Sequence, residues 1–163
     1  MNTLGEKLMT LLGVKRDGNR TSRTDDPVEI LRLSYHDLSR LARQIDAHAD
    51  RAPYPHVAER LRRIASEKRE RAEALRRKMV SFGGRPDDGY LEIRMGKNHW
   101  ERLGRDVDDQ RRLESQFLER ASLLVENAPE VAGFLQEIAT AEHPHREILV
   151  DLLARADPQA HQT

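Results

Sequence analysis

Four long segments of this 163-residue chain repeat apolar residues at helical spacing, and this pattern constrains the fold more than any other feature. In each segment an apolar side chain recurs every three or four residues, which aligns these side chains along one face of an α-helix. The apolar stripes run over residues 31–45, 57–82, 100–124 and 131–152. Because each stripe must be covered by another helix, the sequence predicts an all-α four-helix bundle over residues 27–156.

The composition is typical of long helices with solvated faces. Charged residues make up 34% of the chain, and 28 Lys and Arg residues balance 28 Asp and Glu residues. This balance argues against a nucleic-acid binder, and the absence of cysteine excludes disulfides and thiolate metal ligands. No apolar run approaches the roughly 20 residues of a membrane span, and the N-terminus does not resemble a signal peptide. We therefore expect a cytoplasmic protein.

The two ends of the chain differ from the bundle segments. Residues 1–14 place four leucines at helical spacing, which predicts a short amphipathic helix. That helix could dock on a partner protein, on a surface or on the chain's own bundle. Residues 15–26 are polar and form a predicted linker, and we expect residues 157–163 to be a disordered tail.

A stretch without helical periodicity, residues 84–97, separates the second predicted helix from the third. About 14 residues can span roughly 45 Å, and a helix of about 28 residues is roughly 42 Å long. The stretch can therefore return along the whole bundle. This favours two antiparallel hairpins joined by one long crossover, rather than an up-down-up-down bundle. Within the crossover, residues 87–89 predict a turn and residues 90–93 could be briefly extended.

Charged and polar residues interrupt the apolar stripes near the middle of three helices. They are Lys68 and Arg71 in the second helix, Glu114 in the third, and Glu142 and His145 in the fourth. A glutamate and a histidine three residues apart share one helical face, so both can bind the same ion. Glu114 and Glu142 are about equally far from the turn that joins their helices. We therefore expect them to face each other at the same height.

This arrangement resembles the ferritin-like superfamily, and especially its rubrerythrin-type members. In that family two helices each supply a glutamate and the other two each supply a Glu-x-x-His pair. These residues hold two iron ions and leave positions open for oxygen or peroxide. The resemblance covers residues 27–156. It implies that Glu114, Glu142 and His145 bind iron or another divalent metal, and that the protein has a role in iron or peroxide handling.

The first half of the chain departs from the family pattern. The positions that match the second Glu-x-x-His pair hold Lys68 and Arg71, and the first helix offers Tyr35 where the family has a glutamate. Two cations therefore stand in place of two metal ligands.

Two registers of the second helix follow from this departure. If Lys68 and Arg71 point inward, they would repel metal ions and pair with the glutamates of the third and fourth helices. If the helix is turned by one residue, Glu67 and Glu70 point inward and rebuild a carboxylate-rich site. The flanking apolar residues favour the first register.

The remaining unusual residues are expected to be structural. Pro144 removes one backbone hydrogen bond from the fourth helix and either bends it or is tolerated there. We interpret Trp100 as a core residue and His99 as a polar residue near the start of the third helix. Four further histidines are expected to be exposed: His48, His56, His143 and His161.

Two functional hypotheses remain open from the sequence. In the first, the protein is a ferritin-like metal-binding protein with a residual half-site, and whether it is an enzyme stays undecided. In the second, it is a metal-free bundle that serves as a structural or interaction module, with residues 1–26 as a docking arm. Bundles of this type often pair along exposed hairpins, so either hypothesis is compatible with a homodimer.

Overall fold

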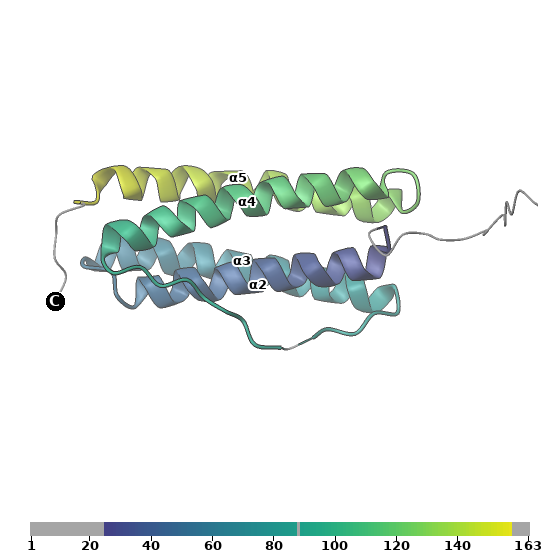
Figure 1. The fold of residues 1–163 in the computed structure, drawn as a ribbon, viewed down its shortest axis with the longest axis horizontal. Coiled ribbons are helices and arrows are strands. Elements are labelled where there is room, and N and C mark those ends of the chain that lie inside the picture. The colour runs from purple at the N-terminus through teal and green to yellow at the C-terminus, as the bar shows by residue number, and fades with distance from the viewer. Residues whose placement is uncertain (1–24, 88, 158–163) are drawn as a thin grey trace, which may run out of the picture.

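The computed structural model describes residues 25–87 and 89–157. These residues form four helices, which are α2 (Pro27–Ala49), α3 (Pro55–Ser81), α4 (His99–Leu124) and α5 (Pro129–Arg155). The predicted all-α bundle is therefore confirmed (Figure 1). The predicted N-terminal helix, most of the linker, the last six residues of the tail and His161 lie outside the described residues.

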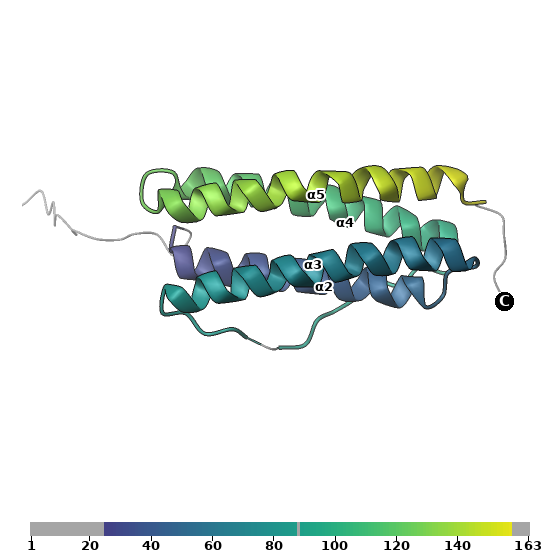
Figure 2. The same cartoon turned by 180° about the vertical axis from the view of Figure 1, so that it is seen from behind.

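The helices pair as two antiparallel hairpins, α2 with α3 and α4 with α5 (Figure 1). The hairpins meet chiefly through α2 against α4, whereas α3 and α5 have few contacts. The connection between α3 and α4 runs along the outside of the α2–α3 hairpin from one end of the bundle to the other (Figures 1 and 2). This confirms the predicted crossover. Residues 90–93 have no regular secondary structure, so the extended segment does not form a strand.

The helix ends are set by local capping groups. The Asp26 side chain accepts a hydrogen bond from the Val28 amide at 3.1 Å, directly before Pro27 begins α2. At the same end of the hairpin, where α3 ends, Gly83 has a φ of 82°, and the Gly84 amide donates to the Met79 carbonyl at 2.9 Å. Glycine adopts this left-handed conformation readily and so ends α3 as the sequence predicts.

The apolar stripes form the core of the bundle. Burying one large aliphatic or aromatic side chain contributes about 1.5–3 kcal/mol, so the stripes supply most of the driving force for folding. None of the helices in this described part of the chain is long and apolar enough to cross a membrane. The side chains with no exposed surface include Leu31, Leu38, Ile45, Leu61, Leu75, Leu103, Phe117, Leu135 and Leu149.

The start of α4 corrects one prediction. Trp100 is 41% exposed, whereas His99 is only 8% exposed. Asn98 caps the helix by accepting a hydrogen bond from the Glu101 amide at 2.8 Å. Positions 99 and 100 lie four and three residues before the buried Leu103, so helical spacing alone allows either one to be buried. Because adjacent residues differ by about 100° around a helix, the side chain at position 100 falls outside the buried face.

Candidate functional site

Lys68 of α3 lies at the centre of the bundle and has no exposed surface. Its Nζ donates hydrogen bonds to Gln110 Oε1 at 2.5 Å and to the Glu142 carboxylate. Glu70, which the shifted register would bury, is exposed. The register with Lys68 inward is therefore confirmed.

Arg71 approaches the same carboxylate from the next turn of α3. Its Nη1 donates to Glu142 Oε1 at 2.6 Å and lies 3.2 Å from His145 Nδ1. Gln110 Nε2 donates to Glu142 Oε2 at 3.1 Å and to the Glu142 backbone carbonyl at 3.1 Å. We call this group the Lys68 cluster. Its members are Lys68, Arg71, Gln110, Glu142 and His145.

His145 connects the Lys68 cluster to the edge of α3. Its Nε2 lies 2.7 Å from Glu67 Oε2, and its Nδ1 lies 3.3 Å from Glu142 Oε2. The Glu67 side chain is 44% exposed, so its carboxylate reaches the imidazole from the solvent side. In the confirmed register, helical spacing does not predict that Glu67 reaches this cluster. The signal was its position four residues before Arg71, which lets the two side chains meet on one helical face.

Glu114 does not join the Lys68 cluster. It forms ion pairs with Arg146 at 3.1 Å and with His143 at 3.8 Å, and both partners lie on α5. Lys68 and Arg71 pair with Glu142 as expected, but the expectation that they would also pair with Glu114 is wrong. The second carboxylate near Arg71 is that of Glu67. Glu114 Oε2 is buried, and although Arg146 Nη1 lies 3.1 Å from it, no described residue donates a well-directed hydrogen bond to this oxygen. Burial raises the pKa of Glu114, and the nearby Glu142 carboxylate adds to that rise.

The charges of the Lys68 cluster stabilise one another. Burial alone would raise the pKa of Glu142, but Lys68 and His145 outweigh it and hold that pKa well below its usual range. Burial lowers the pKa of Lys68, although the Glu142 carboxylate opposes this change. Glu142 is therefore ionised at neutral pH, and its buried charge needs a neighbouring cation. Lys68 and Glu142 are thus an ammonium–carboxylate ion pair.

The donor set at the bundle centre does not fit a dinuclear metal centre. Such a centre needs anionic ligands to offset the charge of two cations, and here an ammonium and a guanidinium already neutralise the central carboxylate. Within residues 25–87 and 89–157, no three His, Asp or Glu side chains are grouped so that they could hold a metal ion.

Pro144 lies between the two motif residues of α5. The helix continues through it from Pro129 to Arg155. Glu142 and His145 remain buried on the same face on either side of the proline. The proline is therefore accommodated without separating the two side chains.

A second buried polar group lies between α2, α4 and the crossover. His48 Nδ1 is 2.7 Å from Asp106 Oδ2. Gln44 Nε2 donates to Asp106 Oδ1 at 2.9 Å and to Asp109 Oδ2 at 3.0 Å. We call these residues, together with Arg94, the His48 cluster. The prediction that His48 is exposed is wrong, since only 1% of its surface is accessible.

The His48 cluster fastens the crossover to the bundle. The Arg94 amide donates to Gln44 Oε1 at 2.8 Å, and the Arg94 carbonyl lies 3.1 Å from His48 Nε2. The Arg94 side chain donates to Asp109 Oδ1 at 2.9 Å. Burial raises the pKa of Asp106, although hydrogen bonds from His48 and Gln44 oppose the rise.

Comparison with solved structures identifies the fold. The chain is similar to a bacterioferritin from Rhodobacter capsulatus, with a TM-score of 0.70 and 17% identity, covering 78% of this chain and 83% of that one. It is also similar to a bacterioferritin-related thioferritin from Bacteroides fragilis, with a TM-score of 0.67 and 16% identity, covering 79% and 86%. The chain therefore has the ferritin-like four-helix-bundle fold.

These comparisons concern the fold alone. The bacterioferritin structure is described as having a metal-free dinuclear site and a haem iron, and the thioferritin as a dodecamer. No family model matches the chain. No curated protein matches its sequence.

Proposed function

We propose that the protein is a ferritin-like bundle that works without a dinuclear metal centre, as a structural or interaction module. The observation that carries this proposal is the position of Lys68. Its ammonium group is buried at the bundle centre and bound to Glu142 and Gln110. Metal ions at the bundle centre would be repelled by the Lys68 ammonium group. A metal ion that took Glu142 as a ligand would leave this ammonium group buried without its partner.

The partners of this module follow from the rest of the chain. We assign residues 1–14 as the arm that docks on a partner protein, because their leucines lie at helical spacing. We also propose that the chain forms a homodimer, and the dodecameric state of the thioferritin supports self-association. We place the protein in the cytoplasm.

Metal analysis of the purified full chain tests the proposal. We expect far less than one iron, zinc or manganese ion per chain, even after expression in iron-rich medium. Changing Lys68→Glu together with Arg71→His restores the missing Glu-x-x-His pair, and we expect this variant to bind Co²⁺ at stoichiometric levels in a spectroscopic titration. The matched control is Arg77→Gln together with Lys78→Gln on the outer part of α3, which should bind no Co²⁺. Stoichiometric metal in the native protein, lost on Glu142→Ala, would overturn the proposal.

One observation favours a second candidate, a residual metal site that uses Glu114, Glu142 and His145. The His145 imidazole lies beside the carboxylates of Glu67 and Glu142, which are ligand types that iron, zinc and manganese accept. The described residues hold no ready-made group of three such ligands, so Glu114 would have to leave Arg146 to complete the site. Metal binding there would require Lys68 and Arg71 to withdraw from Glu142. In this case the protein would handle iron or peroxide, as the family resemblance implies, and the native chain would retain iron.

A further inference from the structure

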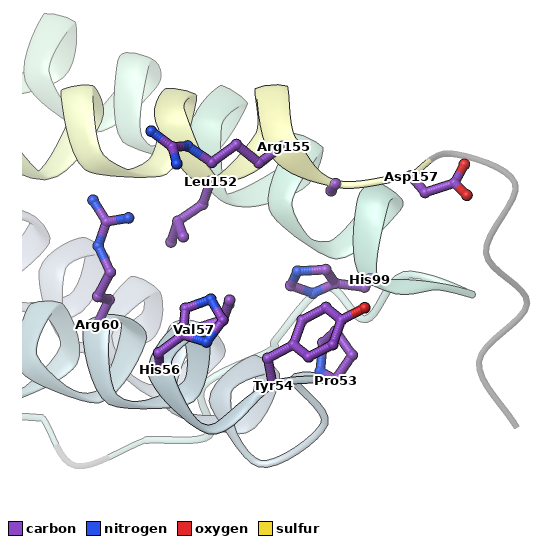
Figure 3. Close-up of a pocket in the computed structure, with 10 residues that line it drawn as sticks. Pro53, Tyr54, His56, Val57, Arg60, His99, Leu152, Arg155 and Asp157 are labelled. Atoms are coloured by element: carbon purple, nitrogen blue, oxygen red, sulfur yellow. The ribbon is translucent and has the colours of Figure 1, made fainter.

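A cavity of about 340 Å³ lies at the end of the bundle where α3 and α4 begin and α5 ends (Figure 3). Val57 and Leu152 supply apolar surface on two of its sides. Val57 precedes Lys68 by eleven residues on α3, which is about 16 Å along the helix, so the cavity is separate from the Lys68 cluster. An apolar cavity of about 150 Å³ holds one benzene molecule. The present cavity therefore has room for a substituted ring or two fused rings.

His99 directs an imidazole without a partner into this cavity. Its residue surface is 92% buried, and its ring faces the cavity in Figure 3. Within the described part of the chain the ring makes no hydrogen bond and no ion pair. Burial, with Arg102 and His48 nearby, lowers the pKa of His99, so the neutral ring offers one donor and one acceptor. Neither ring nitrogen is fully buried, so both can be reached by a molecule bound in the cavity.

Two arginines border the opposite side of the cavity. Arg60 Nη1 and Arg155 Nε bind the two oxygens of Asp151 at 3.1 and 3.0 Å, so one carboxylate balances two guanidinium groups. The two terminal nitrogens of Arg155 make no hydrogen bond to any described residue. Figure 3 shows both guanidinium groups on one side and the His99 ring on the other, with the Asp157 carboxylate pointing away from the arginines. An Arg terminal nitrogen pair suits the planar geometry of a carboxylate.

Two aromatic rings line the cavity near its opening. The rings of Tyr54 and His56 stack with their centroids 5.7 Å apart and their planes at 18°. Tyr54 is largely exposed although its ring borders the cavity. A planar ring bound here could lie against these two rings on one side and against the aliphatic side chains of α3 and α5 on the other.

We propose that this cavity is a binding site for a small planar aromatic carboxylate. The ring occupies the apolar space, the carboxylate binds the terminal nitrogens of Arg155, and a polar substituent on the ring bonds to His99. This site does not depend on whether the centre of the bundle holds a metal.

Titration of the full chain with 2-naphthoate and with 6-hydroxy-2-naphthoate, whose hydroxyl group can bond to His99, followed by amide NMR shifts, tests the site. We expect saturable binding with a Kd on the order of 100 µM, with shifts confined to residues around the cavity. Neutral 2-naphthamide should bind about tenfold more weakly, because it lacks the charge that Arg155 recognises.

Two variants and one control make the test specific. Arg155→Gln changes an exposed side chain and should weaken 2-naphthoate about tenfold while leaving 2-naphthamide unchanged. Arg77→Gln removes the same charge from an exposed position at the other end of α3 and should change neither affinity. Ala156→Phe fills the cavity and should abolish binding of both compounds.

Three results would overturn the proposal. The first is the absence of saturable binding to the native chain. The second is an equal loss of affinity in the Arg155 and Arg77 variants, which would indicate attraction by overall charge. The third is unchanged binding to the folded Ala156 variant, which would place the compound elsewhere.

Discussion

The Lys68 cluster and the His48 cluster bury charge in the same bundle in opposite ways. In the Lys68 cluster, two cations converge on the single carboxylate of Glu142. In the His48 cluster, Gln44 and His48 bind Asp106, whereas Asp109 is bound by Gln44 and by the partly exposed Arg94 and Arg40. The first cluster therefore depends on a fully buried ammonium–carboxylate pair, whereas the cations of the second cluster are partly exposed and its buried Asp106 depends on hydrogen bonds. We expect loss of one member to cost more in the first.

The two clusters also connect different elements of the bundle. The Lys68 cluster joins α3 to α4 and α5, where α3 and α5 have few direct contacts. The His48 cluster joins α2 to α4 and to the crossover backbone at Arg94. Each cluster therefore links the two hairpins, and only the second also links them to the crossover.

The largest effect is expected for Lys68→Met. This change leaves Arg71 as the only cation that binds the buried Glu142 carboxylate, and we expect the free energy of unfolding to fall by about 3 kcal/mol, the low end of the range for breaking a buried ion pair. Urea unfolding measures the change. Lys78→Met is the matched control on the same helix, because Lys78 pairs with the exposed Glu130, and it should cost about 1 kcal/mol or less.

A double variant identifies the origin of that loss. Lys68→Met combined with Glu142→Leu removes both charges, and it should recover much of the stability, since buried ion pairs can be replaced by apolar residues at little cost. A double variant as unstable as Lys68→Met alone would show that the loss of charge compensation at the Glu142 carboxylate is not the cause, and the view of Lys68 and Glu142 as a charge pair would fail.

A smaller effect is expected for Asp106→Asn. The amide keeps the shape of the carboxylate but disturbs the hydrogen bonds to His48 and Gln44, which should lower the free energy of unfolding by about 1–3 kcal/mol. The control is Asp108→Asn, two residues along the same helix on an exposed position, which should have almost no effect. If Asp106→Asn costs more than Lys68→Met, the ranking of the two clusters is reversed.

The two clusters should also respond oppositely to acid. Folding lowers the pKa of Glu142, so the unfolded chain binds its proton first, and this group loses stabilising effect as the pH falls through about 4.5. Folding raises the pKa of Asp106, so the folded chain binds that proton first, and this group gains stabilising effect as the pH falls toward 3.8. Each contribution is at most about 1.4 kcal/mol per pH unit.

Urea unfolding between pH 6 and pH 3.5 measures this difference. Glu142→Gln should flatten the loss of stability on acidification relative to the native chain, and Asp106→Asn should steepen it. Glutamine keeps a hydrogen-bond acceptor for Lys68, which favours a folded variant. Equal slopes in the two variants would contradict the opposite pKa shifts.

Much of the fold was predictable because helical periodicity determines which face of each helix is buried. The spacing of Ile64, Leu75 and Met79 was enough to place Lys68 inward, and the length of the crossover was enough to predict the pairing of the hairpins. Both features depend on local geometry, with 1.5 Å of rise and about 100° of rotation per residue.

The unpredicted parts of the site depend on partners that are distant in the sequence. Spacing predicted the height of Glu114 but could not show that Arg146 and His143 would draw its carboxylate away from Lys68. His48 follows the buried face of α2, yet its partner Asp106 lies 58 residues further along the chain. Nothing in the local sequence identifies that partner.

Because Arg94 is bound to Gln44 and His48 of α2, the two hairpins should stay together after a protease cleaves the crossover. Most of the described crossover residues before Arg94 are exposed or half-buried, and Tyr90 is 85% exposed. A protease that cleaves after Tyr90 would separate the polypeptide into one fragment with α2 and α3 and another with α4 and α5. The second fragment would keep Arg94, whose backbone is held by Gln44 and His48 of the first. The two fragments could then serve as a split pair that reassembles through the interface between the hairpins.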